Sequence, residues 1–145
     1  MPDFPPEPQA VHSPPTRHAI FIVATLNPGA AAAETVRGWC ADVATLTRTV
    51  GTRSPQENLS CVCAFGSDAW DALFGQPRPA GLHPFRVFGE GARVAVSTPG
   101  DLLLHIRADS MDLCFELATL LVNGLGDAVT VVDEVHGFRL SLIHI

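Results

Sequence analysis

"LLLHIRADSMDLCFELATLLVNGLGDAVTVVDEVHGF", residues 102–138, predicts a strand, a helix and a second strand in direct succession. Leu102–Ala108 is an apolar run of strand length, and Ala128–Phe138 is rich in β-branched residues. Between them, Asp109 is predicted to cap a helix that "GLGD" ends. The apolar stripe of this helix repeats at helical spacing and comprises Met111, Cys114, Phe115, Ala118, Leu121, Val122 and Leu125.

The preceding part of the chain predicts the same order of elements. A strand at His18–Leu26 is followed by a helix over about Ala30–Val50 and a strand at Leu59–Phe65. "SDAWDALFG" then predicts a short helix with Ser67 as its N-cap, followed by a Gly- and Pro-rich excursion over 76–100 without a core of its own. The order β-α-β-β-α-β predicts an α+β, ferredoxin-like fold, in which two long helices cover one face of an antiparallel sheet.

The second face of this sheet is predicted to need a cover. The strand at His18–Leu26 carries apolar residues on both faces, whereas a strand of an antiparallel sheet that faces water alternates apolar and polar residues. An exposed apolar face of this kind is unusual for a monomer. We therefore expect another subunit, or another domain of the same chain, to pack against it.

Composition excludes several classes of protein. The 145 residues suit one domain, and a net charge of −6 with nine Lys and Arg argues against nucleic-acid binding. No apolar run approaches the ~20 residues that cross a bilayer. Residues 1–17 are rich in proline and predict a disordered or extended arm without an export signal, so a cytoplasmic location is expected.

The cysteines are predicted to be structural free thiols, as is usual in a reducing compartment. Cys61 and Cys63 share one face of their predicted strand, but no neighbouring ligands would complete a metal site. Cys40 and Cys114 lie in the apolar stripes of the two long helices. No metal site is therefore predicted.

Four polar residues are the candidate site. His105 and Arg107 share a face of one strand, and Glu134 and His136 share a face of the last strand. If they form a quartet on one sheet face, contact with solvent or with another domain is the first interpretation, and a ligand site is the alternative. Nucleophile elbows, phosphate loops, HExxH motifs and paired carboxylates are not found in the sequence.

Four stretches carry a family resemblance: "AFGSDAWDALFG", "PRPAGLHPF", "LLLHIRADSMDLCFELA" and "VVDEVHGFR". In this order they resemble the amino-terminal half of DyP-type (dye-decolourising) haem peroxidases, in particular the bacterial short-loop branch, from about Ala19 to Arg139. The resemblance implies half of a two-domain fold whose two ferredoxin-like sheets face each other. It also implies haem b, held mainly by the carboxy-terminal domain, and the oxidation of dyes, phenols or other donors by hydrogen peroxide.

The family's catalytic groups have no counterpart up to Arg139. The aspartate of the GxxDG motif, the proximal histidine and the distal arginine are expected beyond that residue, so no catalytic residue is assigned. His105, Arg107, His136 and Arg139 are candidates only for contact with the missing carboxy-terminal domain. The chain alone is expected to be inactive and free of haem. The full-length protein is expected to be a homo-oligomer, and encapsulation inside a protein compartment is left open.

The last six residues, "LSLIHI", do not resemble the family. The codons CTG-TCT-CTT-ATA-CAC-ATC would encode them, and that string resembles a transposase end sequence used as a sequencing adaptor. We therefore expect residues 140–145 to be adaptor-derived, the alternative being a natural truncation.

Two functional alternatives are kept. One is a stand-alone ferredoxin-like binding or regulatory module that dimerises through its sheet face. The other is a small protein that handles haem or a metal through His105 or His136.

Overall fold

The computed structural model describes residues 8–141, so the outer parts of the predicted arm and tail, 1–7 and 142–145, lie outside the described residues. The main elements are β1 (His18–Leu26), α1 (Ala30–Gly51), β2 (Ser60–Phe65), α2 (Ser67–Phe74), β5 (Leu102–Ala108), α3 (Met111–Leu125) and β6 (Val129–Phe138). Two short 3-10 turns, η1 (Pro55–Glu57) and η2 (Gly126–Ala128), and a hairpin of β3 (Phe88–Glu90) and β4 (Arg93–Ala95) complete the fold.

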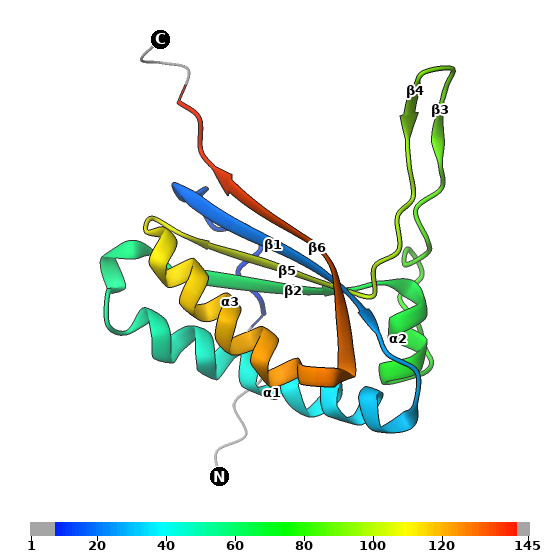
Figure 1. Cartoon of the computed structure of the whole chain (residues 1–145), viewed down its shortest axis with the longest axis horizontal. Coiled ribbons are helices and arrows are strands. Elements are labelled where there is room, and N and C mark those ends of the chain that lie inside the picture. Colours follow the sequence, from blue (N-terminus) through cyan, green and yellow to red (C-terminus); the bar gives the residue numbers. More distant parts are fainter. Residues whose placement is uncertain (1–7, 142–145) are drawn as a thin grey trace.

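The main sheet has four strands in the order β2-β5-β1-β6, and all neighbouring strands are antiparallel. The long helices α1 and α3 lie side by side against one of its faces (Figure 1). This is the predicted β-α-β-β-α-β fold, with α2 as a short addition after β2, so the α+β prediction is confirmed.

The core lies between the sheet and the two long helices. Ile20 and Ile22 of β1 and Leu104 and Ile106 of β5 point toward the helices and are almost fully buried. On the other side of the core, the indole Nε1 of Trp39 in α1 donates a hydrogen bond of 3.0 Å to the carbonyl oxygen of Leu121 in α3. This buried bond joins the two helices directly.

The predicted apolar stripe of α3 is wrong at one position. Phe115 is 61% exposed, whereas Leu113 and Leu117, which the stripe omits, are buried. Most of this helix is apolar, so several stripes fit the sequence, and only the packing against β5 and α1 decides which of them faces inward.

Both predicted helix caps are shifted by one residue. The N-cap of α3 is Ser110 rather than Asp109, and the carboxylate of Asp109 instead accepts hydrogen bonds from the Arg17 backbone N–H and the Asn58 side chain. In α2 the N-cap is Gly66, and Ser67 lies inside the helix. A Cβ at Gly66 would come within 2.6 Å of the Gly100 carbonyl oxygen, so close backbone packing favours glycine there.

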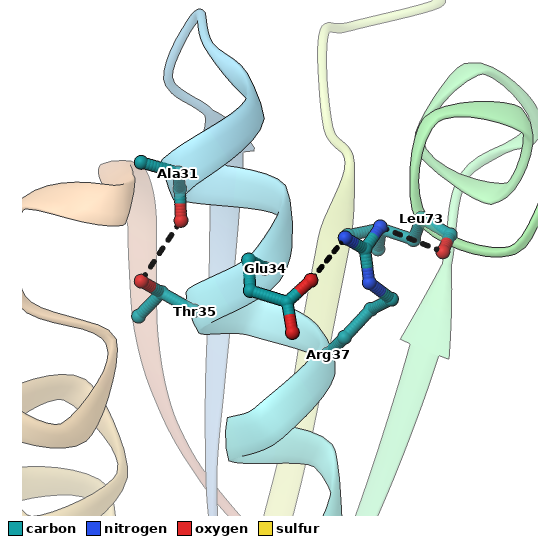
Figure 2. A network of polar contacts seen from close by, with 5 residues as sticks. All are labelled: Ala31, Glu34, Thr35, Arg37 and Leu73. Carbon is teal, nitrogen blue, oxygen red and sulfur yellow. Dashed lines mark hydrogen bonds and ion pairs between the residues drawn. The ribbon is translucent and has the colours of Figure 1, made fainter.

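The short helix α2 is tied to α1 by one arginine (Figure 2). The guanidinium of Arg37 donates to the Leu73 carbonyl oxygen at 3.1 Å and forms an ion pair with Glu34 one turn earlier in α1. On the same helix, the Thr35 hydroxyl donates to the Ala31 carbonyl oxygen. The Arg37–Leu73 bond fixes the end of α2 against the side of α1, while the other two contacts lie within α1.

The excursion over 76–100 contains the β3–β4 hairpin, which stands clear of the sheet and helices (Figure 1). Its apolar side chains are exposed, including Phe88 and Val94. Within residues 8–141, no helix is long and apolar enough to cross a membrane.

The described part of the amino-terminal arm, 8–17, has no helix or strand but contacts strands β2 and β5 of the main sheet. The side chain of Gln9 pairs with the backbone of Cys63 in the edge strand β2: its amide nitrogen donates to the Cys63 carbonyl at 2.9 Å, and its oxygen accepts from the Cys63 N–H at 2.6 Å. The carbonyl of Ala10 accepts a hydrogen bond from Arg107. Gln9 therefore occupies hydrogen-bonding positions that an additional strand would use.

Candidate functional site

The face of the main sheet opposite the helices is the candidate site, and we call it the open face. Strand register places on it Ser60, Val62 and Ala64 of β2; Leu103, His105 and Arg107 of β5; Ala19, Phe21 and Val23 of β1; and Asp133, Val135 and Gly137 of β6. Apolar side chains on it are exposed, with Leu103 at 37% and Val135 at 49%. The structure thus has the uncovered apolar face that the sequence predicts.

His105 stacks on an aromatic ring at the centre of the open face. Its imidazole lies 4.4 Å from the ring of Phe21, with 14° between the two planes. Partial burial, and secondly the positive charge of Arg107, lower the pKa of His105 from its usual 6.5. The neutral ring is therefore favoured, which suits a packing contact with Phe21.

Arg107 is the buried cation of this face, with 8% of its surface exposed. Its Nε donates to the hydroxyl of Ser60 at 3.0 Å, and its Nη2 donates to the carbonyl of Ala10 at 2.8 Å. Within residues 8–141 it forms no ion pair. The arginine thus joins β5, β2 and the arm through neutral acceptors alone.

The predicted quartet on one sheet face is wrong, because Glu134 and His136 lie on the helix side of the sheet. They are opposite Ile22 and Ile20, whose side chains point into the core. The imidazole Nε2 of His136 lies 2.6 Å from the Glu134 carboxylate, and both side chains are about half exposed. They form a separate surface pair on the edge strand β6.

Arg139, the fourth interdomain candidate, lies where β6 meets the arm. Its backbone N–H donates to the Arg17 carbonyl at 2.8 Å, and its Nη1 donates to the Pro15 carbonyl at 3.4 Å. The structure therefore brings Arg139 close to Arg107 and His105 around one cavity, and leaves His136 outside it. The spacing of these residues in the sequence does not predict that they line one cavity, because the cavity forms only when the arm docks beside them.

The cysteines are all free thiols in the structure. Cys61 and Cys63 are opposite Ile106 and Leu104, so both point to the helix side. Burial raises the pKa of each of these two thiols to about 12, which makes them poor nucleophiles and poor metal ligands. Within residues 8–141, no cluster of three or more His, Cys, Asp or Glu has the arrangement of a metal site.

Two cavities of the described residues bear on haem binding, and neither fits the group. The cavity beside His105 has a volume of about 230 Å³, below the roughly 300–1,000 Å³ of pockets that enclose a drug-sized ligand. A larger groove, about 1020 Å³, lies between α1 and β2, and its lining includes no histidine. Its cysteines include Cys61 and Cys63, whose raised pKa values disfavour the thiolate that would bind iron. Neither of these two cavities therefore offers a fitting haem site among the described residues.

Comparison with known proteins places the chain in one family. Residues 8–139 match the model of the Dyp-type peroxidase amino-terminal domain. Two curated relatives are Dye-decolorizing peroxidases: the protein from Brevibacterium linens is 54% identical over 132 residues, and that from Mycobacterium tuberculosis is 52% identical over 132 residues. Each alignment covers 91% of this chain, but only 35% and 39% of the respective relative. The chain thus spans well under half the length of these relatives.

Solved structures agree with the sequence matches. The encapsulated DyP-type peroxidase of Mycobacterium smegmatis is 51% identical and superimposes with a TM-score of 0.89, over 94% of this chain and 44% of that one. A DypB variant from Rhodococcus jostii, solved in complex with heme, is 42% identical with a TM-score of 0.88, over 92% of this chain and 43% of that one. The chain belongs to the Dyp-type peroxidase family and carries its amino-terminal, ferredoxin-like domain.

Proposed function

We propose that residues 18–139 are the amino-terminal domain of a haem-dependent peroxidase, and that a carboxy-terminal ferredoxin-like domain packs on the open face. The observation that carries this proposal is the family match over residues 8–139. The exposed apolar side chains of the open face support it independently, because a face of this kind is stabilised by a covering layer.

The proposed activity of the whole protein is the oxidation of dyes, phenols or other donors by hydrogen peroxide, with haem b bound mainly by the covering domain. The heme named in the Rhodococcus jostii structure supports the choice of cofactor. For this chain we propose a structural contribution: His105, Arg107 and Arg139 contact the covering domain and take no catalytic role. The 145-residue chain alone is accordingly proposed to be inactive and without haem.

Haem titration of two proteins tests this proposal. The 145-residue chain should show no Soret band of a ligated haem and no turnover with peroxide. A chimera in which residues 8–139 replace the matching segment of the Brevibacterium linens relative should bind haem and oxidise a dye. A ligated Soret band with turnover from the chain alone would contradict the proposed inactivity. A folded chimera that binds no haem would contradict the domain assignment.

We further propose a cytoplasmic homo-oligomer, with encapsulation as an additional state. The encapsulated DyP-type peroxidase of Mycobacterium smegmatis supports encapsulation. Sedimentation of the chimera tests the oligomeric state, and a monomer at micromolar concentration would contradict it.

The second candidate is a stand-alone module that dimerises through the open face. The exposure of Leu103 and Val135 favours it as well, since a second copy would bury the same side chains. The two candidates differ in the coding sequence expected after the Arg139 codon. If the family proposal is correct, an assembled genome should have codons for a GxxDG motif shortly after this point. Residues 140–145 would then be adaptor-derived. Codons for "LSLIHI" and a stop within continuous genomic sequence would favour the stand-alone module.

A further inference from the structure

One cavity of the open face is lined by cations without an acidic residue. It has a volume of about 230 Å³ and lies where the arm, β1, β5 and the end of β6 meet. Its charged and titratable lining residues are Arg17, His18, His105, Arg107 and Arg139, and Asp and Glu are absent from the lining. The net charge of the chain is −6, so this local excess of positive charge is opposite in sign to the chain as a whole. No acidic side chain of the lining neutralises it.

The three arginines differ in their surroundings. Arg17 and Arg139 also line a neighbouring hollow that contains Asp109. Hydrogen bonds from the Asn58 side chain and the Arg17 backbone N–H, and after them the charges of Arg17 and Arg139, lower the pKa of that carboxyl group. Arg107 has no such partner within residues 8–141, although its surface is more than nine-tenths buried. Its two hydrogen bonds, to Ser60 and Ala10, use Nε and Nη2, so no described acceptor bonds to Nη1.

A buried guanidinium without a counter-ion is unfavourable, and the group that best compensates it is an oxyanion. Carboxylate and phosphate oxygens match the planar donors of arginine and form short, charge-assisted hydrogen bonds. The volume of the cavity suits a group of this size, and the imidazoles of His18 and His105 offer further donors at its wall.

We propose that this cavity is a binding site for a carboxylate or phosphate group, with Arg107 as its anchor. The anion is either a small solute or an acidic group of a covering domain, and both sources share this chemistry. The inference depends on the local geometry alone and holds whether or not the proposed peroxidase function is correct.

Thermal melting of the 145-residue chain with inorganic phosphate tests the site. At constant ionic strength and micromolar protein, phosphate that binds the folded state should raise Tm saturably, whereas its general salting effect grows without saturation. Arg107→Gln should lose the saturable part. The matched control is Arg93→Gln in the exposed hairpin, which should retain it. Arg107→Lys keeps the charge but loses the planar donors, and should weaken binding roughly tenfold.

The absence of a saturable rise in the wild-type chain would overturn the proposal, as would an unchanged rise in folded Arg107→Gln. If Arg107→Gln does not fold, Arg107→Lys decides, because an unchanged phosphate affinity would refute the anchoring role of the guanidinium. The chimera distinguishes the two sources. If the site takes a solute, phosphate still raises its Tm saturably. If an acidic group of the covering domain fills the site, phosphate has no such effect and Arg107→Gln lowers the Tm of the chimera.

Discussion

The imidazole of His105 lies beside three features of the open face: the parallel ring of Phe21, the charge of Arg107 on the same strand, and the edge of the cationic cavity. The Phe21 contact depends on the pairing of β1 with β5, which places the two residues opposite each other. At the scale of one residue, a histidine that looks like a ligand is thus a packed aromatic group whose neutral form is favoured.

The lowered pKa of His105 predicts a specific loss of stability in mild acid. In the unfolded chain its pKa is about 6.5, so below that pH the unfolded state binds a proton that the folded state resists. This contribution to stability is complete above about pH 6.5 and is lost as the pH falls through 6.5 toward the folded-state pKa. Urea unfolding at pH 7.5 and pH 5.5 should show a smaller decrease for His105→Gln than for the wild-type chain.

A suitable control is His83→Gln, since His83 lies in an exposed loop, and it should keep the wild-type decrease. An identical pH dependence in His105→Gln and the wild-type chain would show that burial beside Arg107 does not perturb this ring.

The contacts of Trp39 predict how much the link between α1 and α3 contributes to the free energy of unfolding. Its indole is buried and donates a hydrogen bond to the Leu121 carbonyl oxygen. The ring also packs closely on Gly124 of α3, since a Cβ added there would lie 3.0 Å from the Trp39 Cδ1 atom. Trp39→Phe should lower the free energy of unfolding by about 1–3 kcal/mol through the lost bond and ring volume. Phe115→Leu on the exposed side of α3 should change it by less than about 0.5 kcal/mol in the same denaturant titration. Equal effects of the two substitutions would contradict the assigned packing.

At the scale of elements, the sequence predicts all four strands of the main sheet and both long helices to within one or two residues. This succeeds because each carries its own periodicity. The predicted quartet fails for a physical reason: alternation fixes which residues of one strand share a face, but only register fixes which faces of two strands coincide. The pairing of β1 with β6 shifts between Val23 and Ala24, an irregularity that the apolar run of β6 does not signal.

The contact between the arm and the β2 edge is likewise invisible in the sequence, because Gln9 and Cys63 are 54 residues apart. It predicts protection of a single edge amide. The Cys63 N–H donates to the Gln9 side chain, so Gln9→Ala should speed hydrogen exchange at Cys63 while Ile106 in the interior strand β5 is unaffected. Gln56→Ala in η1 is the matched control. Unchanged exchange at Cys63 would mean that the arm does not dock in solution.

For the whole molecule, the open face is the feature that a single copy of this chain leaves unsatisfied. Burial of apolar surface is worth roughly 25 cal/mol per Å². A few hundred Å² left exposed would therefore forfeit on the order of 10 kcal/mol, comparable to the stability of a domain. The 145-residue chain, without a covering domain, should consequently associate with itself.

Sedimentation velocity over a range of micromolar concentrations measures this association. Leu103→Lys and Val135→Lys place charges on the open face and should shift the chain toward monomer. Because both side chains are already partly exposed, the Tm should change little. Phe115→Lys adds the same charge on the outer side of α3 and should leave association intact, since that side chain lies on the opposite side of the molecule from the open face. A wild-type monomer at all concentrations would remove the need for a covering layer, and equal association in all variants would place the contact elsewhere, with the exposed β3–β4 hairpin as the next surface to test.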